Sequence, residues 1–249
     1  METLLHAMGD GFLSVMGHVG LNVDLMERYG LRFLGGVWIT LSLVGLSTFL
    51  GSVLALPLAV ARVEGGKYLA RASFTYSYFF RGTPLLAQTF LIYYGAGQFR
   101  EQLTDIGLWW FFRDAFNCAV FTFTLNTAAY QSEILRGGIQ TLPAGQMEAA
   151  QALGLSRVTA YRKVILPQAI AVGLRPLGNE LVLMIKASAI ASVITVYDLM
   201  GVTRLAFSRS YDMEVYLWAA VLYLLMVEIV RRVWDVLERR LNRHLLLSR

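Results

Sequence analysis

The sequence predicts an all-α, polytopic membrane protein with five transmembrane helices, and three observations carry this prediction. Of the 249 residues, 56% are hydrophobic and only 16% are charged, whereas a soluble domain is about 45–50% apolar and about 25% charged. Five segments are long and apolar enough to cross a bilayer, which takes about 20 residues. The basic residues gather in alternate connections between these segments, a pattern that is typical of membrane topology.

The five predicted spans follow one another along the chain. They cover residues 33–60, 74–97, 116–135, 167–196 and 215–236. The second and fourth also contain charged side chains. Before the first span, residues 11–21 are apolar, but the stretch is short and His18 interrupts it. This favours an interfacial or loop helix there rather than a sixth span.

The distribution of basic residues predicts the orientation of the chain. Thirteen of the 22 Lys and Arg residues lie in the 1–2 loop, the 3–4 loop and the C-terminal tail, and six lie in the N-terminal region and the other two loops. Positively charged loops face the cytoplasm. We therefore expect an extracytoplasmic N-terminal segment (1–32), a transmembrane domain (33–237) and a basic cytoplasmic tail (238–249), with the 3–4 loop in the cytoplasm.

The polar 3–4 loop has the signals of a helix, a sharp corner and a second helix. Residues 143–153 are rich in strong helix formers. Gly154 can adopt the left-handed conformation that ends a helix, and Leu155 can make the hydrophobic contact that follows it. Ser156 can cap a second helix, and Pro167 marks the passage into the fourth span. By itself this pattern leaves two interpretations open, a capped linker and a surface for a cytoplasmic partner.

The spacing within this loop carries a family resemblance. Glu148-Ala149-Ala150 is followed by Gly154, and then by Val164 and Leu166-Pro167. This order resembles the EAA loop of ABC-importer permeases, in which Ile usually stands where this chain has Val164. The resemblance implies that the loop (143–167) docks on an ATPase subunit. The coupling positions that it implies are Glu148, Ala149, Ala150, Gly154, Leu155 and Pro167.

Other stretches extend the resemblance over nearly the whole chain. Residues 81–95 (RGTPLLAQTFLIYYG) and residues 132–156 are similar to the polar amino-acid uptake branch of this family. Residues 178–204 (GNELVLMIKASAIASVITVYDLMGVTR) look most like the histidine/arginine and opine permease subunits. The chain departs from the branch at Ala189, where a hydroxyl side chain is common.

The resemblance implies a permease subunit of an ATP-driven importer, which moves a polar or basic amino acid, or a derivative such as an opine, across the bacterial cytoplasmic membrane. The chain has no G-x-x-x-x-G-K-[ST] phosphate-binding loop, so we expect neither an enzyme activity nor a cofactor of its own. ATP and Mg²⁺ belong to a partner ATPase. The expected partners are two ATPase subunits, a second permease subunit (identical or paralogous), an extracytoplasmic solute-binding protein and membrane lipid, without nucleic acid.

Other functions remain as alternatives. The chain could serve an importer of another small polar solute. A stand-alone secondary transporter would commonly show internal repeats, and none is evident in the sequence. A membrane-embedded enzyme would need a catalytic constellation, and the sequence has no cluster of His, Asp, Glu, Ser or Lys with suitable spacing.

Ionisable groups within a bilayer are costly, so they normally face a partner, a cavity or a pathway. In the fourth span, Arg175, Asn179 and Lys186 fall within about 40° of one another at 100° per residue, whereas Glu180 points elsewhere. In the third span a second polar stripe recurs at helical spacing. It consists of Thr122, Asn126, Tyr130 and Glu133. We expect both stripes to face the interior of the assembled permease.

Two roles compete for these polar residues. They can contact a zwitterionic solute, whose amino group needs an acceptor and whose carboxylate needs a donor. Alternatively, they can form structural interhelical pairs, such as Glu133 with Arg175 or Lys186. The candidates for the translocation path are Asn126, Glu133, Asn179, Glu180, Lys186 and Ser188.

The motif Arg81-Gly82-Thr83-Pro84 is predicted near the inner part of the second span. Pro84 can kink the helix and Gly82 permits close packing. The motif is therefore a candidate for gating or for packing. The alternative is that Arg81 extends its charged end to the cytoplasmic surface of the membrane.

Overall fold

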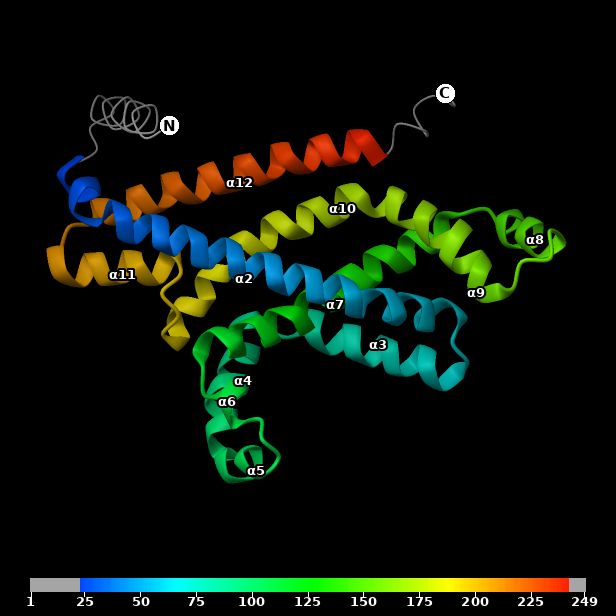
Figure 1. Cartoon of the computed structure of the whole chain (residues 1–249), viewed down its shortest axis with the longest axis horizontal. Coiled ribbons are helices and arrows are strands. Elements are labelled where there is room, and N and C mark those ends of the chain that lie inside the picture. Colours follow the sequence, from blue (N-terminus) through cyan, green and yellow to red (C-terminus); the bar gives the residue numbers. More distant parts are fainter. Residues whose placement is uncertain (1–22, 242–249) are drawn as a thin grey trace.

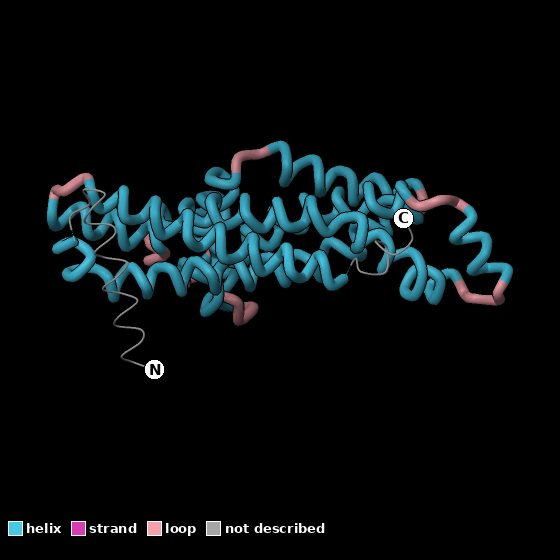
Figure 2. Tube along the Cα trace, turned by 90° about the horizontal axis from the view of Figure 1, so that it is seen from above, coloured by secondary structure: helices cyan, strands magenta, loops and turns pink. Residues whose placement is uncertain are grey.

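The computed structural model describes residues 23–241 and shows an elongated bundle of helices (Figure 1). It contains no strand within that range, which confirms the predicted all-α class. Seen from a direction turned by 90°, the long helices still lie alongside one another (Figure 2). The short helix expected at residues 11–21 lies outside the described residues.

Helix α2 (Val23–Glu64) is the longest element and runs along the bundle (Figure 1). It extends beyond both ends of the predicted first span, and Pro57 lies inside it without ending it. Its main partner is α7 (Ala115–Thr141). A Cβ atom on Gly51 would overlap the side chain of Thr127, so the glycine permits the close approach of these two helices.

The segment predicted as one kinked second span is two helices. Helix α3 (Lys67–Gly82) ends before Thr83, and α4 (Leu85–Gln98) begins after Pro84. Thr83 has an extended backbone, with φ −113° and ψ 146°, because proline disfavours the helical conformation of the residue before it. Pro84 itself has no N–H with which to continue the helix. The expected kink is therefore a complete break, which leaves backbone carbonyls in need of other donors.

Two short helices, α5 (Arg100–Asp105) and α6 (Trp109–Phe112), follow α4 and project from one side of the bundle (Figure 1). Helix α7 begins directly after them. Asp114 caps it, because its carboxylate accepts a hydrogen bond of 2.9 Å from the backbone N–H of Asn117. Helix α7 then extends past the predicted third span and lies at the centre of the bundle.

The predicted helix–corner–helix follows α7 at one end of the bundle (Figure 1). Helix α8 (Gly145–Ala152) precedes the corner, and α9 (Arg157–Ala160) follows it. A π-helical turn, η1 (Tyr161–Ile165), joins α9 to α10 (Leu166–Ala187). The chain therefore passes into the fourth predicted span without an interruption, and Pro167 lies in the first turn of α10.

Helix α10 narrows into a 3₁₀ segment, η2 (Ser188–Ile194), before the chain turns into α11 (Leu199–Ser210). Helix α11 lies at the end of the bundle opposite α8 and α9 (Figure 1). Helix α12 (Glu214–Leu241) returns along the bundle toward the α8 and α9 end.

Buried apolar side chains form three clusters along the bundle. The cluster near α8 and α9 includes Ala59, Leu135, Tyr161, Ile165 and Ala169. The middle cluster includes Leu43, Phe123, Met184 and Ile185, and the cluster beside α11 includes Phe33, Leu199 and Trp218. Each cluster joins α2 to helices that lie far away in the sequence.

Two helical stretches of the described residues, Asp24–Glu64 and Arg157–Ile194, are long and apolar enough to cross a membrane by length and composition. Large apolar side chains point outward from the first of them. Trp38 is 72% exposed and Phe49 is 67% exposed. Such surface is costly in water and is readily accommodated by lipid.

Candidate functional site

A pocket of about 440 Å³ lies where the break between α3 and α4 faces α7 and α10. It brings together residues that are far apart in the sequence. The break contributes residues 81–84, α7 contributes Asn126 and Tyr130, and α10 contributes Glu180 and Met184. The candidate motif at Arg81 and two of the candidate polar residues therefore surround one space.

Two side-chain amides satisfy the carbonyls that the helix break leaves free. Asn126 donates hydrogen bonds to the backbone carbonyl of Phe80 (2.9 Å) and to Oε1 of Gln88 (3.1 Å). Gln88 donates to the same Phe80 carbonyl (2.9 Å) and to Oγ1 of Thr83 (2.7 Å). Asn126 therefore stabilises the break between α3 and α4 by these hydrogen bonds, and it also lines the pocket.

Opposite charges line the pocket on facing elements. Glu180 is 8% exposed and accepts a hydrogen bond of 3.2 Å from Oγ1 of Thr127. Arg81 lies on the break side, with its guanidinium 5.3 Å from the centre of the Tyr130 ring. An acidic and a basic side chain therefore border the same pocket. The candidate Ser188 is not among the residues that line it. Ser188 is fully buried, and its hydroxyl donates to the backbone carbonyl three residues before it.

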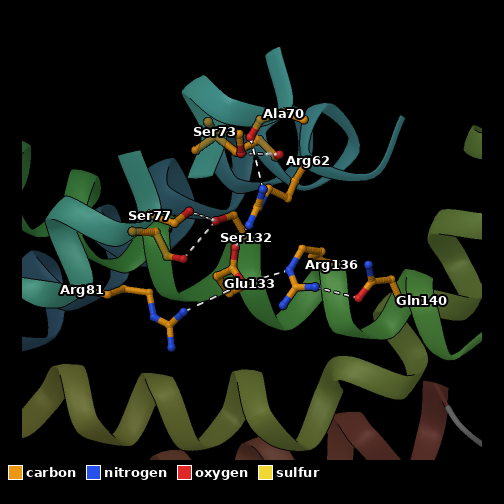
Figure 3. Close-up of polar contacts among 11 residues, drawn as sticks. Arg62, Ala70, Ser73, Ser77, Arg81, Ser132, Glu133, Arg136 and Gln140 are labelled. Carbon is orange, nitrogen blue, oxygen red and sulfur yellow. Dashed lines mark hydrogen bonds and ion pairs between the residues drawn. The ribbon is translucent and has the colours of Figure 1, made fainter. Parts of the chain in front are cut away.

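Glu133 lies beside this pocket and is shared by three arginines. Its carboxylate is 3.8 Å from Nε of Arg62, 3.9 Å from a terminal nitrogen of Arg81 and 2.8 Å from Nε of Arg136 (Figure 3). The three arginines come from α2, α3 and α7. One carboxylate cannot balance three guanidinium groups, so this part of the bundle keeps an excess of positive charge.

Arg175, Asn179 and Lys186 lie on an exposed face of α10. Arg175 forms an ion pair of 2.9 Å with Glu238 of α12. The expected pairing of Glu133 with Arg175 or Lys186 is therefore wrong, because arginines of α2 and α3 lie closer to that carboxylate. That this face of α10 points into an assembled permease stays a prediction.

The corner after α8 has the geometry that the sequence predicts. Gly154 has φ +76°, a left-handed conformation that favours glycine. The backbone N–H of Leu155 donates to the carbonyl of Ala150 at 3.1 Å, which closes the end of the helix. Oγ of Ser156 accepts from the backbone N–H of Thr159 at 3.3 Å and so caps α9.

The corner presents charged and apolar side chains to its surroundings. Glu148 and Ala149 are exposed, whereas Ala150 is buried beneath them. Leu153 is 81% exposed and Val158 is 78% exposed, on the two sides of the glycine. Exposed large apolar side chains in a polar segment are typical of a surface that another protein covers.

Glu64 joins this corner to the end of α2. The hydroxyl of Tyr161 donates to Oε1 of Glu64 at 2.7 Å, and Arg157 forms an ion pair with Oε2. The sequence analysis missed Glu64, because its hydroxyl partner is 97 residues away and no local pattern signals the contact. It also missed Gln88, although a polar residue within a predicted span was a detectable signal.

The outward apolar side chains of the bundle and the polar pocket between its helices together indicate a helical membrane protein. Residues 16–243 match the family described as the binding-protein-dependent transport system inner membrane component, and the chain belongs to this family.

Curated relatives cover nearly the whole chain. It is 40% identical to the nopaline transport system permease protein NocM of Agrobacterium fabrum over 226 residues, which are 90% of this chain and 94% of the relative. It is 39% identical to the histidine/lysine/arginine/ornithine transport system permease protein HisM of Escherichia coli K12 over 221 residues, which are 88% of this chain and 92% of the relative.

Solved structures share the fold. A chain of an amino acid ABC transporter crystallised with histidines superposes with a TM-score of 0.73 and 36% identity, covering 86% of this chain and 96% of that chain. An inward-facing MetNI methionine ABC transporter chain has the same TM-score at 21% identity, so this second likeness concerns the fold alone. The chain is thus a membrane permease subunit of an ABC importer, and the ATPase activity lies in separate partner subunits.

Proposed function

We propose that this chain is the transmembrane permease subunit of an importer of polar or basic amino acids or of amino-acid derivatives such as opines. ATP hydrolysis in separate subunits drives it through the segment 143–167. The transport systems named for the relatives, for nopaline and for histidine, lysine, arginine and ornithine, support this solute class. The ATP and Mg²⁺ are held by the partner ATPase.

The proposed topology has five spans, formed by α2, by α3 with α4, by α7, by α10 with η2, and by α12. The N-terminus lies outside and the C-terminus lies in the cytoplasm of a bacterial cell. The bias of basic residues toward the connection between α2 and α3, the corner and the tail supports this orientation. The corner and α11 lie at opposite ends of the bundle, as this topology requires (Figure 1).

The exposed corner is the observation that carries the coupling role. Leu153 follows the last residue of α8 and Val158 lies in α9, and both side chains are exposed on the two sides of the Gly154 corner. A fixed apolar projection can enter a groove on an ATPase subunit with little loss of conformational freedom. Movement of that groove would then reach α10 directly, because α9, η1 and α10 form a continuous helical path.

The coupling role is tested at Gly154. Gly154→Val cannot adopt φ +76° without strain, whereas asparagine tolerates this conformation. We expect Gly154→Val to lose most uptake and to release the ATPase subunits on purification, and Gly154→Asn to keep both. Gly145→Ala is the matched control in the same segment, because its added Cβ meets open space. Normal uptake, ATPase activity and subunit retention in Gly154→Val would remove the coupling proposal.

The pocket beside the helix break is the proposed site of solute contact. Its volume of about 440 Å³ falls within the range of about 300–1,000 Å³ that is usual for small-ligand pockets. Arg81 is suited to the carboxylate of an amino acid, and Glu180 is suited to its ammonium group or to a basic side chain. The other candidates, Asn179 and Lys186, lie on the exposed face of α10 and would act only in the assembled permease.

Glu180→Gln keeps the shape of the side chain and removes its charge. We expect the half-saturating solute concentration for transport to rise about tenfold or more, because a charge-assisted hydrogen bond is lost. Glu27→Gln, at an exposed acid of α2, is the control. Unchanged transport affinity and selectivity in Glu180→Gln would assign Glu180 a structural role only. Binding measurements with amino acids and opines on the partner binding protein would name the solute.

The assembly contains further proposed partners. The family description names a binding protein, and its proposed docking surface consists of the outward connections at residues 97–115 and 197–214. These include α5, α6 and α11. A second permease subunit, identical or paralogous, and two ATPase subunits complete the proposed importer. Co-purification through a tag on this chain, followed by mass determination of the intact complex, tests this composition.

A further inference from the structure

A further pocket, of about 410 Å³, lies at the junction of α2 and α3 and has no lining residue in common with the proposed solute site. Its lining consists of Arg62, Lys67, Ala70, Arg71 and Phe74. Three of these residues are cationic and none is acidic. Three cationic side chains therefore border a hollow whose exposed wall is mostly apolar. This combination suits an amphiphilic anion, and neither the coupling role nor the solute role uses it.

Arg62 is fixed in place at this pocket. One of its terminal nitrogens donates to the backbone carbonyl of Ala70 at 3.3 Å, and its guanidinium lies 4.4 Å from the centre of the Phe74 ring (Figure 3). Its Nε is buried and has no hydrogen-bond partner among the described residues. The nearest acid is Glu133 at 3.8 Å, and Glu133 is already shared with two other arginines. The positive charge of Arg62 is therefore only partly balanced.

Lys67 and Arg71 lie one turn apart at the start of α3 and are both exposed. Within residues 23–241, neither side chain forms an ion pair. Helix α3 begins after Gly66 without a side-chain cap, and its first intrahelical hydrogen bond comes from Ala70. The positive end of the helix dipole adds to the two cationic side chains. The two side chains and the helix end therefore reinforce one another as a site for a phosphate group.

The surroundings of the pocket favour a lipid over a soluble anion. Phe74 is 45% exposed and Tyr78 is 71% exposed. Both recur with Lys67 and Arg71 at helical spacing on one face of α3, where a soluble phosphate would leave these apolar side chains uncovered. A phospholipid has both parts of the complementary chemistry, because its headgroup is anionic and its acyl chains are apolar.

We propose that this pocket binds the headgroup of an anionic phospholipid in the membrane leaflet that borders the coupling corner. The headgroup phosphate accepts hydrogen bonds from Lys67 and Arg71 and offsets the charge of Arg62, while an acyl chain lies along Phe74 and Tyr78. The site is close to the corner, since Glu64, at the end of α2, contacts Tyr161. This inference goes beyond the proposed function, and its test needs no transport measurement.

The test uses the full-length chain in phosphatidylcholine nanodiscs with a small fraction of photoreactive phosphatidylglycerol. After illumination, labelled peptides are identified by mass spectrometry. We expect labelling of residues 61–82 in the wild-type chain and a decrease of about tenfold or more in Lys67→Gln/Arg71→Gln, because each basic residue near an anionic lipid surface contributes several-fold to binding. The control is Arg239→Gln/Arg240→Gln, which removes two exposed arginines of α12 and should leave this labelling unchanged.

A charge-conserving pair, Lys67→Arg/Arg71→Lys, distinguishes loss of charge from loss of folding and should keep the labelling. Loss of labelling in this pair, or undiminished labelling in Lys67→Gln/Arg71→Gln, would overturn the proposal. Competition separates the two sources of phosphate. Unlabelled phosphatidylglycerol should displace the probe, whereas displacement by millimolar inorganic phosphate would make the pocket a site for soluble anions and would also overturn the proposal.

Discussion

The hydroxyl of Tyr161 donates a hydrogen bond of 2.7 Å to Oε1 of Glu64. This bond connects the turn that follows the corner to the last residue of α2, the helix that runs along the bundle. The same carboxylate pairs with Arg157. The corner is therefore connected to two long helices. It continues into α10 along the backbone, and it contacts α2 through the side chain of Glu64.

Tyr161→Phe should weaken this connection while keeping the packing of the ring. Hydrogen bonds to charged groups contribute about 1.5–3 kcal/mol, so we expect the free energy of unfolding to fall by about 1–2 kcal/mol. Arg157→Gln should cost less than about 1 kcal/mol, because its side chain is 69% exposed. Thermal unfolding in detergent measures both effects, with the exposed Tyr197→Phe as a control. A Tyr161→Phe protein as stable as wild type would show that the bond contributes nothing.

Two adjacent glycines of α7 should respond differently to the same substitution. A Cβ on Gly138 would lie 2.5 Å from the backbone oxygen of Ala169, whereas a Cβ on Gly137 meets open space. Gly138→Ala must therefore push α7 away from α10, at a cost of about 1–3 kcal/mol. Gly137→Ala should be neutral or stabilising by up to about 1 kcal/mol, because alanine favours helix. Equal unfolding temperatures for the two variants would contradict the close approach of these helices.

Glu133→Gln should destabilise the bundle, because the repulsion among three arginines then loses its counter-charge. We expect a loss of about 1–3 kcal/mol, less than for a fully buried pair since the cluster is partly exposed. Adding Arg136→Gln to this variant should restore part of the loss. Thermal unfolding at low and high salt measures the effect, which salt should reduce. Glu101→Gln, at an exposed acid of α5 for which the described residues show no ion pair, is the control. Additive effects in the double variant would argue against a shared cluster.

Gln88→Leu should weaken the break between α3 and α4. The substitution removes the Gln88 donor from the carbonyl of Thr83 and leaves the carbonyl of Phe80 with Asn126 as its remaining side-chain donor. An unsatisfied buried polar group costs about 1–3 kcal/mol. We expect lower thermal stability and a change in solute selectivity, since the same break lines the pocket. Gln98→Leu, at the exposed end of α4, should change neither. Wild-type stability in Gln88→Leu would mean that the carbonyls find other donors.

Local features of the fold followed from the sequence. The corner at Gly154 and the Ser156 cap were predicted correctly, because a left-handed glycine and a capping hydroxyl act on backbone groups a few residues away. The separation of buried Glu180 from the exposed Arg175 face was also predicted, since helical periodicity fixes it. The second span was predicted only in part. Pro84 indicated a kink, but the full break depends on amides from Gln88 and Asn126 that satisfy the freed carbonyls.

The sequence by itself determined the helical class, the apolar segments, the corner at Gly154 and the family resemblance, because each depends on composition, periodicity or a short motif. Only the tertiary structure decided which charges meet. Glu133 pairs with Arg62 and Arg81 rather than with Arg175 or Lys186. Glu64 reaches a residue 97 positions away. Such contacts depend on how helices pack across the bundle, and a side chain's position along one helix does not specify the helix that will lie beside it.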